Sequence, residues 1–280
     1  MAGMHIRPLT NAIGAEITGV DLAGEFDNSS FSAIHDAFLE HHVLVFPGQS
    51  LAPDRQIAFM ARFGAVEPHP LGSRDGHPDH PELLVLENRP GRPGARNDFW
   101  HSDISCAERP PLGSLLHALE VPGEGRGDTM FCNMVRAFET LSDGMRAMLS
   151  GLEAEHTGEA IRRRNAADPT TDANPITDVP PPVRHPVVRR HPESGKRALY
   201  VNQFFTTNFA GMTEAESRPL LDFLGDWATR PDNVYRHRWR VGDAVMWDNR
   251  ATMHYAVMDY DDTMPRRMHR ATAAGDRPAA

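Results

Sequence analysis

Four His-x-acid triplets in the chain could each place an imidazole and a carboxylate on one metal ion. Proline separates the two side chains in the triplets that begin at His77, His80 and His191. We expect these three to be solvated turns, because proline removes a backbone donor and restricts the preceding residue. The fourth triplet is His101-Ser102-Asp103, and in an extended segment its first and third side chains share one face. The same residues are equally compatible with a surface histidine beside a surface aspartate.

A third candidate ligand stands near the far end of the chain. Residues 239–255 have the pattern of a strand, a Gly-Asp turn, a second strand, a polar turn and a third strand. This pattern predicts a rigid β-hairpin that carries His254 toward the first pair. Two histidines and one carboxylate on one side of an ion leave three positions open, an arrangement that suits non-haem Fe(II) and oxygen chemistry.

Three arginines follow this segment. If residues 266–270 form a strand, Arg266 and Arg270 share one face while Arg267 points to the other. Two guanidiniums directed into one cavity would each hold a carboxylate or sulfonate by paired, charge-assisted hydrogen bonds. The alternative is a basic edge on a surface strand.

The elements that must position these residues are short strands and a few amphipathic helices, with no internal repeat. Apolar spacing, a proline in the first turn and a capping box predict helices over 32–41, 53–63, 134–149 and 213–227. Strands are predicted at 43–46, 83–86, 115–119, 187–189, 199–201, 234–239 and 244–247.

This order argues against a regular βαβ alternation and for an antiparallel sandwich or barrel decorated by helices. We predict a mainly β, α+β fold with a double-stranded β-helix core, the jelly-roll or cupin-like type, in a single domain over 1–280. Residues 162–184 are rich in Pro, Asp, Asn and Arg and lack an apolar period. Together with the segment before them they predict a mobile lid at about 157–184.

Composition narrows the class of protein. The 280 residues carry 29 Lys and Arg against 38 Asp and Glu, a formal net charge of −9, which argues against a nucleic-acid binder. Two cysteines cannot build a disulfide framework, so the chain fits a reducing compartment. The apolar runs are too short to cross a bilayer and no secretory signal is evident. We therefore expect a soluble, cytoplasmic protein without a membrane partner.

The order of these motifs resembles the TauD/TfdA family of Fe(II)/2-oxoglutarate-dependent dioxygenases, and most of all its taurine dioxygenases. The resemblance rests on His101-Ser102-Asp103, on His254, on Arg266 and on Arg270, in their contexts Trp-Asp-Asn-Arg (247–250) and His-Arg-Ala-Thr (269–272). It extends from Ile-Arg-Pro-Leu at 6–9 to Gly-Asp at 275–276, and so covers nearly the whole chain.

The resemblance implies roles for individual residues. His101, Asp103 and His254 would bind iron, and Arg266, assisted by Thr129, would hold the distal carboxylate of 2-oxoglutarate. The cofactors implied are Fe(II), 2-oxoglutarate as cosubstrate and dioxygen.

The substrate contacts implied are His69, Asn97, Phe205 and Arg270, with Arg270 on a sulfonate group. The sequence departs from the taurine dioxygenase pattern at Gly72, where a tyrosine is usual, at Cys106, in segment 157–165, and by one extra residue between His254 and Arg266. None of these departures falls on a predicted ligand of iron or 2-oxoglutarate.

The resemblance implies hydroxylation of a small anionic substrate, with taurine or a related alkylsulfonate first, and release of succinate, CO2, sulfite and an aldehyde. Alkyl sulfate esters and aryloxy or other carboxylates are the alternatives within the family. A non-oxidative jelly-roll metal enzyme and a small-molecule binding module are the alternatives from other classes. A homodimer or homotetramer is expected, as in relatives.

Overall fold

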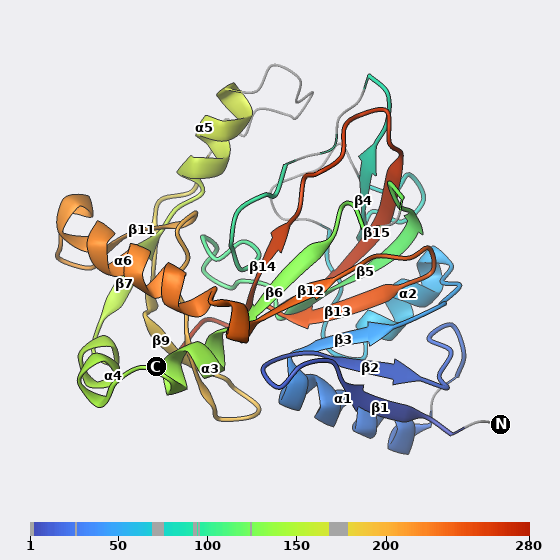
Figure 1. Ribbon diagram of the computed structural model, residues 1–280, viewed down its shortest axis with the longest axis horizontal. Helices are drawn as coiled ribbons and strands as arrows, with labels where there is room; N and C mark the ends of the chain where they lie inside the picture. Colours follow the sequence, from blue (N-terminus) through green and yellow to red (C-terminus); the bar gives the residue numbers. More distant parts are fainter. Residues whose placement is uncertain are drawn as a thin grey trace.

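The computed structural model describes residues 3–25, 27–68, 76–91, 94, 96–123, 125–167 and 179–280. Its core is mainly β, with one large sheet facing a smaller one (Figure 1). The large sheet has seven strands in the spatial order β1 (His5–Pro8), β2 (Ala15–Thr18), β3 (Val43–Phe46), β13 (Ala244–Asp248), β5 (Gly113–Glu120), β15 (Arg266–Ala273) and β4 (Leu83–Asn88). Neighbouring strands are antiparallel except β2 and β3.

Two helices cover the outer face of the large sheet. The first, α1 (Asn28–His41), begins where the Asp27 carboxylate accepts a hydrogen bond from the Ser30 amide, and it ends at His42, whose φ of 62° is left-handed. The second, α2 (Pro53–Met60), begins at a proline, which loses no helical hydrogen bond in the first turn. Their apolar residues pack on alternate side chains of the strands, including Leu115 and Ala271.

The smaller sheet faces the other side and has the order β12 (Val234–His237), β6 (Thr129–Asn133) and β14 (Thr252–Ala256). Phe131 of β6 joins a buried cluster with Leu116, Val245, Trp247 and Met268, which point inward from the large sheet. Even-numbered residues of β15 therefore face the space between the two sheets. This two-sheet core is the predicted cupin-like architecture.

A second group of elements packs beside the core, at the left of Figure 1. It contains α3 (Met134–Glu139), α4 (Asp143–Leu149), β7 (Glu153–His156), α5 (Glu159–Ala167), β8 (Val183–Pro186), β9 (Val188–Arg190), β10 (Arg197–Leu199), β11 (Thr206–Phe209), α6 (Glu214–Ala228) and the 3-10 turn η1 (Pro231–Asn233). The predicted capping box at Thr213 opens α6 through reciprocal hydrogen bonds with Glu216.

Two predictions about local structure are wrong. The helix expected over 134–149 is two helices, because the Ser142 side chain caps a new start at α4. The hairpin expected over 239–255 is absent from the described pairings: β13 pairs with β3 and β5, whereas β14 pairs with β6. The chain crosses from one sheet to the other in the turn 249–251.

The predicted lid is ordered at both of its ends. Glu159 pairs with Arg162 and Arg163 in the first turns of α5, and β8 pairs with β7. Residues 168–178 lie outside the described part of the chain.

The strands expected at 187–189 and 199–201 are observed one or two residues away, as β9 and β10. In the described residues, every helix is too short or too polar to cross a bilayer.

Candidate functional site

The three predicted metal ligands meet between the two sheets. One ligand atom from each of His101, Asp103 and His254 lies within 4.8 Å of the others, and each residue is at most 7% exposed. A backbone bridge holds the histidines together: the His101 amide donates to the His254 carbonyl at 3.1 Å, and the reverse bond is 2.8 Å. This bridge, rather than a hairpin, brings β14 to the His-x-Asp segment.

Asp103 is held as a carboxylate. Its Oδ2 accepts hydrogen bonds from Ser114 Oγ (3.0 Å) and Asn249 Nδ2 (3.2 Å), and its Oδ1 lies 3.3 Å from an Arg270 nitrogen. Burial opposes the charge, but the Arg270 guanidinium and the hydrogen bond from Ser114 hold the pKa of Asp103 well below its usual range. An ionised oxygen is therefore available to a cation.

Both histidines present Nε2 to the carboxylate. His101 Nδ1 lies 2.9 Å from the Phe99 carbonyl, so it carries the proton and leaves Nε2 as an acceptor. The Nε2 atoms of His101 and His254 lie 3.9 and 3.7 Å from Asp103 Oδ1. Burial lowers the pKa of His254 to about 3, so this ring is neutral, as ligation requires.

The residue after Asp103 has an unusual backbone. Ile104 has a φ of 47°, a left-handed conformation that β-branched residues rarely adopt. Its carbonyl closes a turn with the Ala107 amide, and its side chain packs against Cys106 and Phe205. Such strain commonly marks functional sites, and no residue pattern in the sequence signals it here.

An apolar wall stands beside the ligands. It consists of Ile104, Cys106 and Phe205, with Ala107, Ile161 and Phe204 packed against them. Phe205 lies edge-on to His101 with ring centroids 6.3 Å apart. Burial raises the pKa of Cys106 to about 11, so the wall carries no charge from this thiol.

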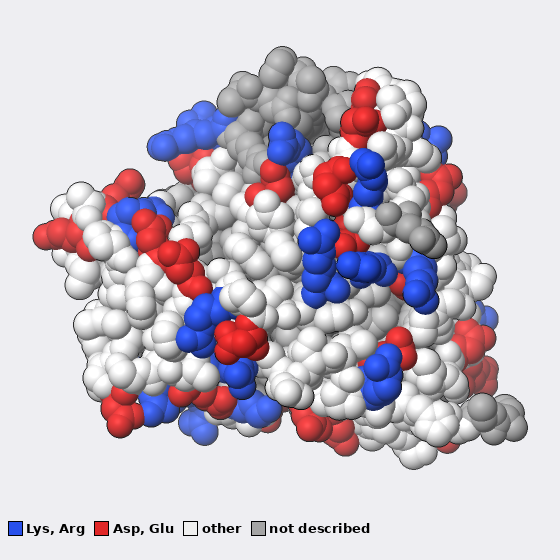
Figure 2. Space-filling view, in the orientation of Figure 1, with Lys and Arg blue, Asp and Glu red and all other residues white. Residues whose placement is uncertain are grey.

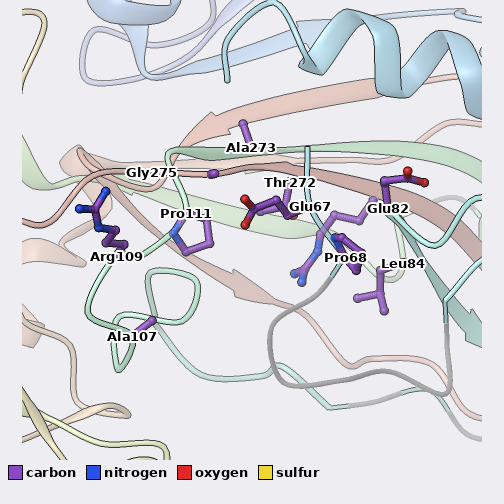
Figure 3. A pocket seen from close by; sticks show the side chains of 12 residues that line it. Glu67, Pro68, Glu82, Leu84, Ala107, Arg109, Pro111, Thr272, Ala273 and Gly275 are labelled. Carbon is purple, nitrogen blue, oxygen red and sulfur yellow. The ribbon is translucent and has the colours of Figure 1, made fainter. Parts of the chain in front are cut away.

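Arg270 is buried and connects the metal ligands to a cavity. Besides its contact with Asp103, it lines a cavity of about 250 Å³ together with Leu84, Arg109 and Thr272. Figure 3 shows Arg109 and Pro111 at one side of this cavity and Leu84 and Glu82 at the other. Figure 2 shows acidic and basic groups side by side on one face of the molecule.

Arg266 shares the inward face of β15 with Arg270, as predicted. Its guanidinium is buried, and its Nε has no hydrogen-bond partner among the described residues. Thr129 is the first residue of β6, which follows the loop after β5. The end of β5 pairs with the beginning of β15, where Arg266 lies. The Thr129 hydroxyl accepts a bond from Trp239 Nε1 at 3.0 Å, and no described residue accepts a hydrogen bond from it.

The remaining predicted residues divide between the described and undescribed parts. The Asn97 carbonyl accepts a hydrogen bond from the Ala256 amide, two residues beyond His254. His69 and Gly72 lie outside the described residues. The expectation that His191 is solvated is wrong: it is 1% exposed and its Nε2 lies 2.9 Å from Asp248 Oδ2.

Two supporting residues were not singled out from the sequence. Ser114 and Asn249 fix the Asp103 carboxylate, and Asn249 Oδ1 is itself bound by Trp247 Nε1 at 3.0 Å. The Trp-Asp-Asn-Arg segment was the available signal for Asn249. Ser114 has no comparable signal, because a serine in an apolar strand has no distinctive pattern.

The geometry agrees with comparisons to known proteins. A family model described as "Taurine catabolism dioxygenase TauD, TfdA family" matches residues 5–272. The chain belongs to this family. An alkylsulfatase from Acinetobacter baylyi is 36% identical over 279 residues, which cover 98% of this chain and 86% of the relative. An alpha-ketoglutarate-dependent sulfate ester dioxygenase from Pseudomonas putida is 34% identical over 286 residues, which cover 98% and 91%.

A solved structure supports the fold of this TauD/TfdA member. The crystal structure of a putative alpha-ketoglutarate-dependent taurine dioxygenase from Burkholderia xenovorans has a TM-score of 0.83 and 34% identity, covering 99% of this chain and 92% of that one. The family is Fe(II)- and 2-oxoglutarate-dependent, and the protein is a dioxygenase. The buried His-Asp-His set fits that metal, because it offers two neutral imidazoles and one ionised carboxylate.

Proposed function

We propose that this dioxygenase hydroxylates a small organic anion whose sulfonate or sulfate head is bound by Arg270. The observation that carries the proposal is the position of Arg270, which lies between the metal ligands and the cavity. A guanidinium there would hold the head group by paired hydrogen bonds and leave the adjacent carbon near the iron. Asn97, Phe205 and His69 are proposed as further substrate contacts, that of His69 from the family resemblance alone.

We further propose that His101, Asp103 and His254 hold iron, while Arg266 and Thr129 hold the distal carboxylate of 2-oxoglutarate. When bound, iron and cosubstrate would supply the oxidising power: 2-oxoglutarate would lose CO2 and take up one oxygen atom of O2 to become succinate, and the other oxygen atom would be inserted into a substrate C–H bond as a hydroxyl. The chain positions the reactants and excludes competing reactions. With a sulfonate on the hydroxylated carbon, the product separates into an aldehyde and sulfite.

An alkylsulfonate is the first candidate substrate, and the apolar wall of Ile104, Phe204 and Phe205 favours an alkyl chain over the short polar chain of taurine. An alkyl sulfate ester is the second candidate. It is supported by the same wall and by the names of the two relatives, an alkylsulfatase and a sulfate ester dioxygenase. Ile161 of α5 contributes to the wall, so we propose that the protein is a single domain in which the segment 157–184 acts as a lid.

The test is a substrate panel with Fe(II) and 2-oxoglutarate. Taurine, hexanesulfonate, hexyl sulfate and phenoxyacetate should be compared by succinate formed and by sulfite or sulfate released. We expect hexanesulfonate or hexyl sulfate to release one inorganic anion for each succinate. Succinate formation that responds to none of the sulfur-containing compounds would overturn the proposed substrate class.

A matched pair of arginine variants tests the head-group role. Arg270→Ala should greatly reduce turnover of the sulfonate. Arg267→Ala should not, because that side chain points to the opposite face and lies near Glu87. Full turnover in Arg270→Ala would refute the role. The expected homodimer or homotetramer and the cytoplasmic location remain predictions, the first open to light scattering.

A further inference from the structure

The loop that joins β14 to β15, residues 257–265, is fastened to the segment that precedes Thr129. The Val257 amide donates to the Asp128 carbonyl at 2.8 Å, and the Gly127 amide donates to Asp259 Oδ1 at 2.7 Å. Arg126 donates to the Asp259 carbonyl at 3.1 Å. One side of this loop is therefore fixed to the strand that carries Thr129.

The other side of the loop is fixed to the edge strand beside Arg266. Asn88, which is 4% exposed, donates from Nδ2 to the carbonyls of Asp261 (2.9 Å) and Met264 (2.8 Å). Asn88 is also the cross-strand partner of Arg266 in the pairing of β4 with β15. Anchors at 259 and 261 thus hold the intervening residue, Tyr260, between the Thr129 strand and the Arg266 strand.

The side chain of Tyr260 is half-buried against this corner. Its Cε1 would lie 3.2 Å from a Cβ placed on Gly127, whose φ of 67° suits glycine, so the ring packs directly on that backbone. Burial raises the pKa of Tyr260 while the nearby Arg266 charge opposes the rise, so the hydroxyl keeps its proton. A protonated phenol near a buried guanidinium can donate to an anion that the guanidinium attracts.

We propose that Tyr260 donates a hydrogen bond to the distal carboxylate of 2-oxoglutarate, as a third group beside Arg266 and Thr129. The inference rests on the proposed cosubstrate role of Arg266. Guanidinium, threonine hydroxyl and phenol together would distinguish a five-carbon 2-oxo diacid from a 2-oxo acid without the second carboxylate. Tyr260 then acts in cosubstrate recognition and makes no contact with the metal ligands.

Direct binding tests this role independently of turnover. 2-Oxoglutarate and 2-oxovalerate, which lacks the distal carboxylate, should be titrated anaerobically into the Fe(II)-loaded full chain by calorimetry and by the visible band of the complex. Tyr260→Phe should raise the Kd for 2-oxoglutarate about tenfold, the size of one lost bond to a charged group, and leave that for 2-oxovalerate unchanged. Tyr235→Phe, which loses its bond to His237 on β12, is the matched control and should bind both acids as wild type does.

The outcomes separate this inference from the function on which it rests. An unchanged Kd for 2-oxoglutarate, or equal weakening of both acids, would overturn the role of Tyr260. Arg266→Gln should abolish the preference for 2-oxoglutarate over 2-oxovalerate. If the Arg266→Gln variant still prefers 2-oxoglutarate, the assignment of Arg266 is wrong. If Arg266→Gln loses this preference while Tyr260→Phe retains all of it, the assignment of Arg266 stands and only the inference about Tyr260 is wrong.

Discussion

Two buried aspartates, each beside an arginine and a histidine, lie in the same molecule and do different work. The Asp248 carboxylate accepts three hydrogen bonds from Arg250, two from the guanidinium and one from the backbone amide, and it has one contact with His191, all at 2.9 Å. Asp103 faces its cationic or ionisable neighbours at longer range, 3.3 Å from Arg270 and 3.7 to 3.9 Å from the two imidazoles.

The two carboxylates differ in how completely fixed partners occupy their oxygen atoms. Asp248 is 0% exposed and its oxygens are bound by fixed partners, so it is a closed structural network that also reaches Glu193 through Arg250. Asp103 has one oxygen held by Ser114 and Asn249, and its other oxygen faces two ring nitrogens and makes a contact of 3.3 Å with Arg270. Those spacings can be spanned by one ion with ligand bonds of about 2.0–2.2 Å. A buried Asp-Arg-His group is thus a functional site only where its geometry leaves room for another atom.

The largest expected effect is on the Asp103 side. Asp103→Ala should lose more than about 100-fold in activity, since removing an outer partner of a metal ligand alone costs about 10–100-fold. The anaerobic Fe(II)/2-oxoglutarate band should disappear, while the circular dichroism spectrum stays that of the folded protein. Retention of the band would remove Asp103 from the metal site.

The next effect is on folding, at Asp248. Asp248→Ala should lower the free energy of unfolding by about 3–5 kcal/mol, because the buried Arg250 would lose its buried carboxylate and keep only the part-exposed Glu193 as an acidic partner among the described residues. Urea denaturation measures this change. Asp232→Ala, which removes an exposed partner of Arg136, is the control and should cost at most about 1 kcal/mol. Equal losses in the two variants would contradict the distinction between the closed network and a surface pair.

A smaller effect is expected at Asn249, which follows Asp248 in the chain but donates its hydrogen bond to Asp103. Asn249→Ala should reduce Fe(II) affinity about 10–100-fold, because it removes the bond that orients Asp103. The melting temperature distinguishes the two variants, because it should fall much less in Asn249→Ala than in Asp248→Ala. An unchanged Fe(II) affinity would show that Ser114 and Arg270 suffice to orient the carboxylate.

The smallest expected effect is a loss of stability toward acidic pH, caused by His42, which lies near Asp248. Burial lowers the pKa of His42 to about 4, against 6.5 in the unfolded chain, although Asp248 partly offsets the shift. Between about pH 6.5 and 4 the unfolded state takes up the proton first, so stability present above pH 6.5 is lost as the pH falls. His42→Asn, which keeps a residue suited to the left-handed φ, should reduce this slope by up to about 1.4 kcal/mol per pH unit. Urea midpoints at pH 7, 6 and 5 measure it, and an unchanged slope would contradict the assignment.

Predictions of local structure were confirmed where they depended on residues a few positions apart in the same helix or strand. The capping box at Thr213, the proline start of α2 and the shared face of Arg266 and Arg270 follow from the periods of helix and strand. The interruption at Ser142 was missed, because a side-chain cap competes with an apolar period that otherwise continues.

The sequence by itself determined the ligand types, the spacing of His101 and Asp103, and membership of a family whose motifs cover the chain. The tertiary structure decided how His254 reaches them, because the turn 249–251 changes sheets and a backbone bridge replaces the hairpin. It also decided that His191 is buried on Asp248 and that Tyr260 lies between two strands. These relations depend on pairings between residues far apart in the chain, and local pattern contains no information about which distant strands pair.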